Sequence, residues 1–222
     1  MSNGYLQYWN VRKVDITLEI ILRKLGKNYS NEKSILRNVN YIFKEGIYLI
    51  KGTSGIGKTT LLNIISGYST ASEGEVILHN IKKICYIMQE TLMFSNLTIK
   101  ENMMIMYPNS IDVLEEKVKE KTRNLGLNEE IMTKRPTNLS GGQIKKAELL
   151  LYTIFNDFDV LLLDEPVSNL DDESIFYVIK YIESLLKEKK IVLIVSHIDL
   201  QFEVPYTVLE VVKGELKEKN EL

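Results

Sequence analysis

The stretch Gly52-Thr53-Ser54-Gly55-Ile56-Gly57-Lys58-Thr59 decides the fold, because it matches the phosphate-binding pattern G-x-x-x-x-G-K-[ST]. An apolar strand, residues 47–51, precedes it, and a helical pattern follows Gly57 and stops at Gly67. Glycines let consecutive backbone N–H groups turn around phosphates, and the helix N-terminus adds its positive dipole end. A chance match is expected in roughly one chain in a hundred of this size. The stretch therefore predicts a nucleotide-binding loop.

The residues of this loop have separable chemical roles. Lys58 can bridge the β- and γ-phosphates of a nucleotide, and the Thr59 hydroxyl can ligate Mg²⁺. The predicted phosphate-binding residues are Gly52, Thr53, Ser54, Gly55, Ile56, Gly57, Lys58, Thr59 and Thr60.

A second chemical signal is the apolar strand 160–163, which ends in Asp164 and Glu165. Beside a phosphate loop, Asp164 would hold Mg²⁺ directly or through water. Glu165 could reach the water that attacks the γ-phosphate and act as general base. The alternative is a core strand that runs into an acidic turn, because acidic residues commonly cap helices. The upstream phosphate loop favours the catalytic interpretation.

Composition excludes several classes of protein. The 222 residues are 45% hydrophobic and 26% charged, with a net charge of -2, so no basic field favours direct nucleic-acid binding. The single Cys85 excludes an internal disulfide framework, and its apolar neighbours predict a buried core thiol. We find no signal-peptide pattern and no apolar run of ~20 residues that could span a bilayer. The prediction is a cytoplasmic chain that reaches a membrane only through a partner.

Periodicity predicts an α/β architecture. The expected strands are 15–25, 47–51, 75–78, 84–89, 160–163 and 191–195. The expected helices are 111–125 (with Ser110 as N-cap and Gly126 as C-cap), 141–155 and 172–188. The tail 207–217 is expected to form a hairpin that turns at 213–214. Residues 29–32 read as a polar turn, His79 as a surface residue, and Lys187, Lys189 and Lys190 as a solvated helix end. Short apolar strands between helices indicate a parallel sheet covered on both faces.

The run Leu139-Ser140-Gly141-Gly142-Gln143 lies ahead of the acidic strand. With it the chain resembles the ABC ATPase family, whose signature is LSGGQ. The resemblance extends from about residue 16 to residue 217. It assigns Gln89 as the Q-loop glutamine, residues 168–171 as the D-loop and His197 as the switch histidine.

The resemblance implies roles for these residues around ATP and Mg²⁺. His197 would contact the γ-phosphate and orient Glu165, although a lone histidine is usually an ordinary polar residue. Tyr29 would stack on adenine, with Tyr41 and Tyr48 as nearby competitors. Asp171 of the D-loop would be a cofactor-binding residue, and it could cap the following helix or do both. The implied catalytic set is Glu165, His197, Gln89 and Lys58, and the implied metal ligands are Thr59, Gln89 and Asp164.

The signature also has a physical interpretation of its own. Ser140 is a good N-cap, and Gly141 and Gly142 expose backbone N–H groups at a helix start, which makes a second anion site on the same chain. In the family this site completes the nucleotide of a partner subunit. Ser140, Gly141, Gly142 and Gln143 would therefore act in trans, on the other subunit's γ-phosphate, in a head-to-tail dimer.

The resemblance further implies the fold and its division. We expect a P-loop NTPase core with a mainly parallel sheet, an N-terminal antiparallel β subdomain and an inserted α-helical subdomain. The whole chain, 1–222, would be one cassette, with its core and β subdomain in 1–90 and 139–222 and the helical subdomain in 91–138.

The resemblance also implies a function. The chain would be the ATP-hydrolysing motor of an ABC transporter, paired with a second ATPase subunit, most simply a copy of itself, under a separate transmembrane permease. It would lie on the inner face of the cell membrane. Export is mildly preferred, because no regulatory domain follows residue 217. The alternative is a soluble ABC ATPase that acts on a cofactor-assembly, cell-division or nucleic-acid and ribosome partner.

Two regions bear on partner contacts. The segment 91–99 with Met103, Met104 and Met106 resembles the family's groove for a permease helix, with Phe94 as the preferred contact; simple packing of the helical subdomain is the alternative. After the signature the family pattern changes in this chain: Lys146 stands for Arg, Glu148 for a small apolar residue and Leu151 for a second Arg.

Overall fold

The computed structural model describes residues 17–30, 33–108, 111–186 and 189–219. Its elements, in chain order, are β1 (Glu19–Ser30), β2 (Lys33–Phe43), β3 (Gly46–Lys51), α1 (Lys58–Ile65), β4 (Glu73–His79), β5 (Ile84–Ile87), α2 (Ile99–Met106), α3 (Ile111–Asn124), the short 3-10 helices η1 (Glu129–Thr133) and η2 (Pro136–Asn138), α4 (Gly141–Thr153), β6 (Val160–Asp164), α5 (Asp172–Leu185), β7 (Ile191–Val195), β8 (Tyr206–Val212) and β9 (Glu215–Glu218).

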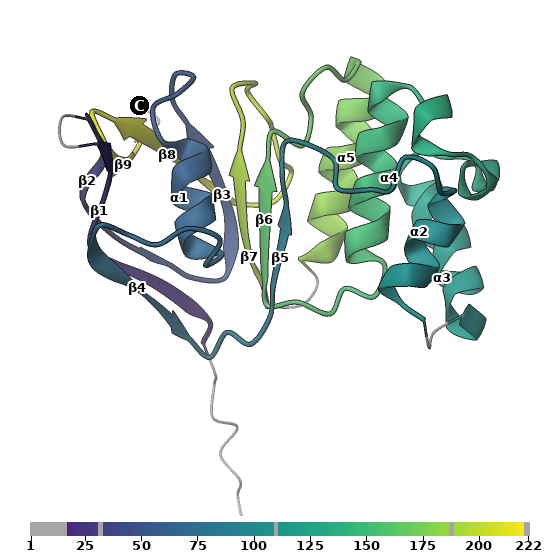
Figure 1. Cartoon of the computed structure of the whole chain (residues 1–222), viewed down its shortest axis with the longest axis horizontal. Coiled ribbons are helices and arrows are strands. Elements are labelled where there is room, and N and C mark those ends of the chain that lie inside the picture. The colour runs from purple at the N-terminus through teal and green to yellow at the C-terminus, as the bar shows by residue number, and fades with distance from the viewer. Residues whose placement is uncertain (1–16, 31–32, 109–110, 187–188, 220–222) are drawn as a thin grey trace, which may run out of the picture.

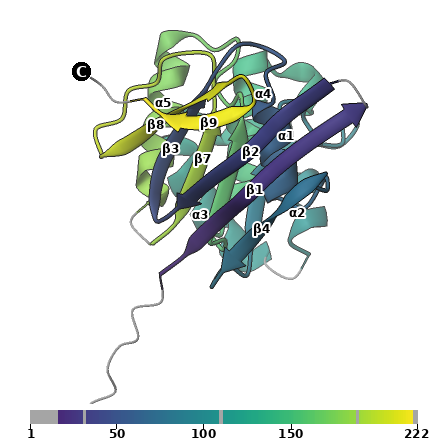
Figure 2. The same cartoon turned by 90° about the vertical axis from the view of Figure 1, so that its left-hand side faces the viewer.

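Two sheets face each other across α1 (Figure 1). The larger sheet has the strand order β5-β6-β7-β3-β8-β9, parallel except for the final antiparallel pair. The smaller sheet, β2-β1-β4, is antiparallel and lies in front in Figure 2. Helices α4 and α5 cover the other face of the larger sheet, and α2 and α3 lie beyond α4 (Figure 1). The predicted fold class, a P-loop NTPase core with an antiparallel β subdomain and an inserted helical part, is confirmed.

The central strands are buried on both faces, as their continuous apolar sequences require. Every residue of β6 and β7 is buried. Along β3, Ile47 and Leu49 pack in the core on the helical side, while Tyr48 and Ile50 pack in the core around α1. This alternation anchors the strand rigidly, and the phosphate loop leaves from its end.

The sequence analysis missed β2. Its buried apolar residues, Leu36, Val39 and Phe43, are spaced three and four residues apart, which resembles a helical period. The cause is a series of register shifts between β1 and β2, with Asn38 at φ 45°, so the two-residue alternation is broken. The predicted turn at residues 29–32 is also wrong in part, because Tyr29 belongs to β1; residues 31–32 lie outside the described residues.

β1 spans residues 19–30 where 15–25 was predicted, whereas the other strands and helices with a predicted range match it within three residues. α4 and α5 end at Thr153 and Leu185, two and three residues early, and the hairpin turns at Lys213-Gly214 as expected. Gly126 closes α3 with φ 59°, whereas the predicted cap Ser110 lies outside the described residues. The proposed division at residues 90/91 and 138/139 stays a prediction.

Three predictions about single residues have clear outcomes. His79 is exposed, as expected. Cys85 is partly buried against the core, and burial raises the pKa of its thiol to about 12. The prediction of a solvated end is wrong for Lys190, which is buried and donates from Nζ to the carbonyl oxygens of Asn156 and Phe158.

Candidate functional site

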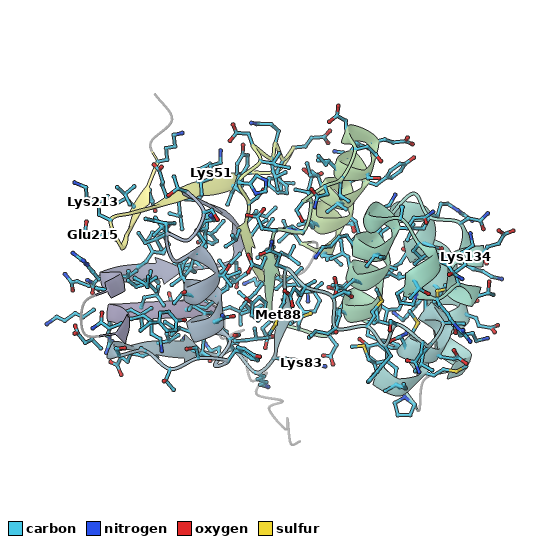
Figure 3. The ribbon with its side chains drawn as sticks, turned by 45° about the horizontal axis from the view of Figure 1, so that its top comes forward. Lys51, Lys83, Met88, Lys134, Lys213 and Glu215 are labelled. Atoms are coloured by element: carbon cyan, nitrogen blue, oxygen red, sulfur yellow. The ribbon has the colours of Figure 1, made fainter. Side chains whose placement is uncertain are left out.

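A cleft of about 550 Å³ opens at the carboxyl end of the larger sheet. Its lining comprises Tyr29, Ile35, Ser54, Gly55, Gly57, Lys58, Thr59, Thr60, Gln89, Glu165, Val195 and His197. The loops after β3, β5, β6 and β7 all contribute, because parallel strands end at the same edge. In Figure 3, Lys51 marks this edge at the end of β3, whereas Lys83, just before β5, marks the opposite edge.

The phosphate loop is formed by glycines that adopt conformations disfavoured for other residues. Gly57, the N-cap of α1, has φ 118°, and a Cβ there would lie 2.7 Å from Cγ2 of Ile35. No side chain caps α1, so its first N–H groups remain directed at the cleft. The buried Lys58 donates from Nζ to the carbonyl oxygens of Gly52 (2.7 Å) and Thr53 (3.2 Å). The cationic group is thus stationed inside the loop.

Asp164 provides a test of the predicted metal site. Its side chain is buried at the end of β6, and neither carboxylate oxygen has a hydrogen-bond partner among the residues that the structure describes. Burial raises the pKa of this carboxyl group, the neighbouring Thr59 hydroxyl opposes the rise, and the charge of Glu165 adds to it. A buried carboxylate beside a threonine hydroxyl is a donor set that suits Mg²⁺. The residues present therefore fit the metal.

Glu165 and His197 lie in direct contact. Nδ1 of His197 is 2.8 Å from Oε2 of Glu165, and the same oxygen accepts a 3.4 Å hydrogen bond from the backbone N–H of His197. Glu165 is mostly buried and has φ 53°, a strained conformation for a residue with a side chain, and its own N–H donates to the Val195 carbonyl. The turn directs the carboxylate of Glu165 into the cleft.

Tyr29 and Gln89, two of the residues assigned from the resemblance, line the cleft with exposed side chains. Tyr29 is 63% exposed at the cleft and lies near the Lys27 ammonium group, so its ring is available for stacking. Gln89 is also exposed, two residues after β5. Ile35 and Val195 line the cleft but were not anticipated; Ile35 belongs to the unpredicted β2, and Val195 was assigned only as core.

The signature residues do not line this cleft. Ser140 caps α4 by accepting from the Gln143 N–H, and Gln143 Oε1 accepts from the Ser140 N–H, so the two form a capping box. Ser140 and Gly141 are exposed, and a Cβ at Gly141 would meet nothing within 4 Å. Asp171 accepts from the Ser174 N–H at 2.7 Å, which lowers the pKa of its carboxyl and caps α5. The exposed N-terminus of α4 therefore lies outside the lining of the cleft.

Comparison with known proteins places these features in a family. The ABC transporter family matches residues 36–168, more than half of the chain. The chain belongs to the ABC transporter family. It is 31% identical over 181 residues to the thiamine import ATP-binding protein of Haemophilus influenzae, a match that covers 75% of this chain and 83% of that protein.

Solved structures agree with this assignment. A dimeric bacterial ABC transporter cassette superposes with a TM-score of 0.78 at 27% identity, covering 90% of this chain and 97% of that one. A dimeric post-hydrolysis ATP-binding cassette with ADP and phosphate gives a TM-score of 0.75 at 26% identity, with the same coverage. This chain is an ABC transporter ATP-binding subunit that binds and hydrolyses ATP. Within the described part of this ABC subunit, no helix is long and apolar enough to cross a membrane.

Proposed function

We propose that this ABC subunit hydrolyses ATP in the cleft at the end of its parallel sheet. The proposal rests on one observation: the phosphate loop, Gln89, Glu165 and His197 line one cleft although they come from four different loops. Lys58 would bind the β- and γ-phosphates, and Tyr29 would stack on the adenine. Glu165 would accept the proton of the attacking water while His197 orients it.

Magnesium would bind at the base of this cleft. Thr59, Gln89 and Asp164 are the proposed ligands, and the unpaired buried carboxylate of Asp164 supports the assignment. The ion would neutralise charge on the β- and γ-phosphates while the γ-phosphoryl group is transferred to water.

A second subunit, most simply another copy, would complete the site. The exposed N-terminus of α4 lies outside the subunit's own cleft, and the similar solved cassettes are dimeric. Ser140, Gly141, Gly142 and Gln143 would contact the partner's γ-phosphate, with Asp171 near the same interface. Hydrolysis removes that bridging charge and lets the subunits separate.

A separate permease would receive this motion. Four large apolar side chains are exposed on the segment after Gln89 and on α2: Leu92, Phe94, Ile105 and Met106. Exposed apolar groups of this kind mark interaction surfaces. Of the other residues named with Phe94 at the sequence level, Met103 is buried in the core, and Leu97 and Met104 are only partly exposed.

The direction of transport is open. Most of the similar curated proteins carry the names of import ATP-binding proteins, which gives the mild preference for export no support.

The alternative function, in which the partner is a soluble assembly, cell-division or ribosomal complex, is tested by identifying what the chain binds. After gentle detergent extraction of the tagged chain from its own cell, we expect a polytopic membrane protein in near-equal amount. Recovery of a soluble scaffold or ribosome would leave the ATPase and discard transport.

Two substitutions test the assigned chemistry. Glu165→Gln should abolish turnover and trap an ATP-bound dimer, measured by phosphate release and by light scattering after gel filtration. Lys58→Ala should lose nucleotide affinity, measured by calorimetric titration with ATP. Turnover by Glu165→Gln at the wild-type rate would remove Glu165 as base, and unchanged binding by Lys58→Ala would overturn the phosphate-loop assignment.

A further inference from the structure

Helix α4 carries a buried carboxylate that the hydrolytic site does not use. Glu148 is 1% exposed, and its Oε1 accepts a 3.3 Å hydrogen bond from the backbone N–H of Leu92. Its Oε2 is buried 3.9 Å from Nζ of Lys145, three residues earlier on the same helix. Burying a carboxylate costs desolvation free energy unless the group is paired. For Glu148 the Leu92 N–H and the Lys145 ammonium group are the partners that offset this cost.

Lys145 makes the second contact to the same stretch of chain. Its ammonium group donates to the carbonyl oxygen of Gln89, and its side chain is only 14% exposed. The two charged residues of α4 therefore bind the backbone at both ends of residues 89–92. We call this stretch the Gln89 segment.

The far side of the segment is fixed independently. Asn102 of α2 is buried, accepts from the Phe94 N–H at 2.7 Å and donates to the Phe94 carbonyl at 3.1 Å. The Gln89 segment follows β5 closely, and the chain just after it is held by Asn102. Among the described residues of α4, only Lys145 and Glu148 bind this segment through polar side chains. Helix α4 begins at the signature residues, and we call it the signature helix. Any shift of Gln89 relative to the signature helix must break these contacts.

We propose that Lys145 and Glu148 are positioning residues that hold Gln89 at the nucleotide cleft and join its position to that of the signature helix. The inference rests on the proposed role of Gln89 in hydrolysis. The pair acts through the backbone of the segment and does not touch the cleft, since neither residue lines it. The family pattern has a small apolar residue in place of Glu148, so this link is a feature of this chain's own sequence.

A double-mutant cycle tests the coupling. Glu148→Ala should lower kcat roughly tenfold, the worth of one charge-assisted hydrogen bond, while the Kd for ATP changes less than about twofold. In a Gln89→Ala background the same substitution should cost less than about twofold, because the group being positioned is already gone. Glu148→Gln keeps an oxygen for the Leu92 N–H and should recover most of the rate. Glu116→Ala, an exposed carboxylate of α3, is the surface control.

Hydrogen exchange of the same proteins provides a readout independent of activity. The Leu92 amide should exchange faster in Glu148→Ala and remain protected in Glu148→Gln. Equal losses of kcat in both backgrounds, or unchanged exchange at Leu92, would overturn the proposal. If Gln89→Ala alone leaves kcat at the wild-type value, the proposed role of Gln89 fails first, and the positioning role falls with it; an impaired Gln89→Ala with an unimpaired Glu148→Ala sinks only the positioning role.

Discussion

At the scale of single residues, Lys190 shows how a charge can be part of a core. Its Nζ donates to the carbonyl oxygens of Asn156 (2.9 Å) and Phe158 (2.6 Å) and lies 4.4 Å from the centroid of the Phe158 ring. Lys190→Met should lower the free energy of unfolding by about 1–3 kcal/mol, because the buried carbonyl group of Phe158 and the partly buried one of Asn156 lose their donor. Urea unfolding followed by circular dichroism measures this change.

Lys82→Met is the matched control for this substitution. Lys82 is exposed near the same edge of the sheet, where a surface change is worth about 0.5 kcal/mol or less. Equal effects of the two substitutions would show that Lys190 contributes no more than a surface lysine.

At the scale of elements, the end of α3 depends on a glycine. Gly126 has φ 59°, and a Cβ at this position would lie 2.6 Å from ring carbons of Tyr177 on α5. Gly126→Ala combines a left-handed backbone, which costs roughly 1–2 kcal/mol for a residue with a side chain, with a steric overlap. We therefore expect a loss of about 2–4 kcal/mol in unfolding free energy, measured by thermal or urea unfolding.

Gly67→Ala separates the two causes. Gly67, just after α1, also has a positive φ of 80°, but a Cβ there would meet nothing within 4 Å. It should cost only about 1 kcal/mol. A Gly67→Ala protein that is as unstable as Gly126→Ala would show that the α3–α5 contact is not tight.

At the scale of the whole molecule, the separation of the signature from the cleft predicts complementation between two defective subunits. Lys58→Ala disables a subunit's own cleft, and Gly141→Asp adds a negative charge at the exposed N-terminus of α4. This charge favours the helix but repels phosphate. If the signature acts in trans, a mixed dimer keeps one intact site, formed by the normal cleft of one subunit and the normal signature of the other.

The expected outcome is a recovery of ATPase activity on mixing. Each variant alone should be nearly inactive, whereas a 1:1 mixture should reach about a quarter of the wild-type rate, because half of the dimers are mixed and each has one working site of two. Phosphate release from the mixture measures it, and Gly141→Asn, which is neutral, is the control for charge. A mixture no more active than its parents would argue against action in trans.

Much of this protein follows from short stretches of its sequence. The phosphate loop, the Asp164-Glu165 pair and the signature are each a continuous run of residues. In each run the residue types indicate the chemistry, and the adjacent strand or helix sets the local conformation. The central strands could be predicted for the same reason, since continuous apolar runs such as 191–195 have no other stable environment.

Other features depend on contacts between residues distant in the sequence, and only the tertiary structure decides them. Register shifts hide β2 from any period of two, so Ile35 could not be placed at the cleft. The contact of His197 with Glu165 requires the parallel pairing of β6 and β7. The run of lysines predicts solvent exposure for Lys190. For Glu148, the sequence shows only that the residue departs from the family pattern and does not indicate that it is buried. Both are buried because the packing provides backbone partners that no local pattern reveals.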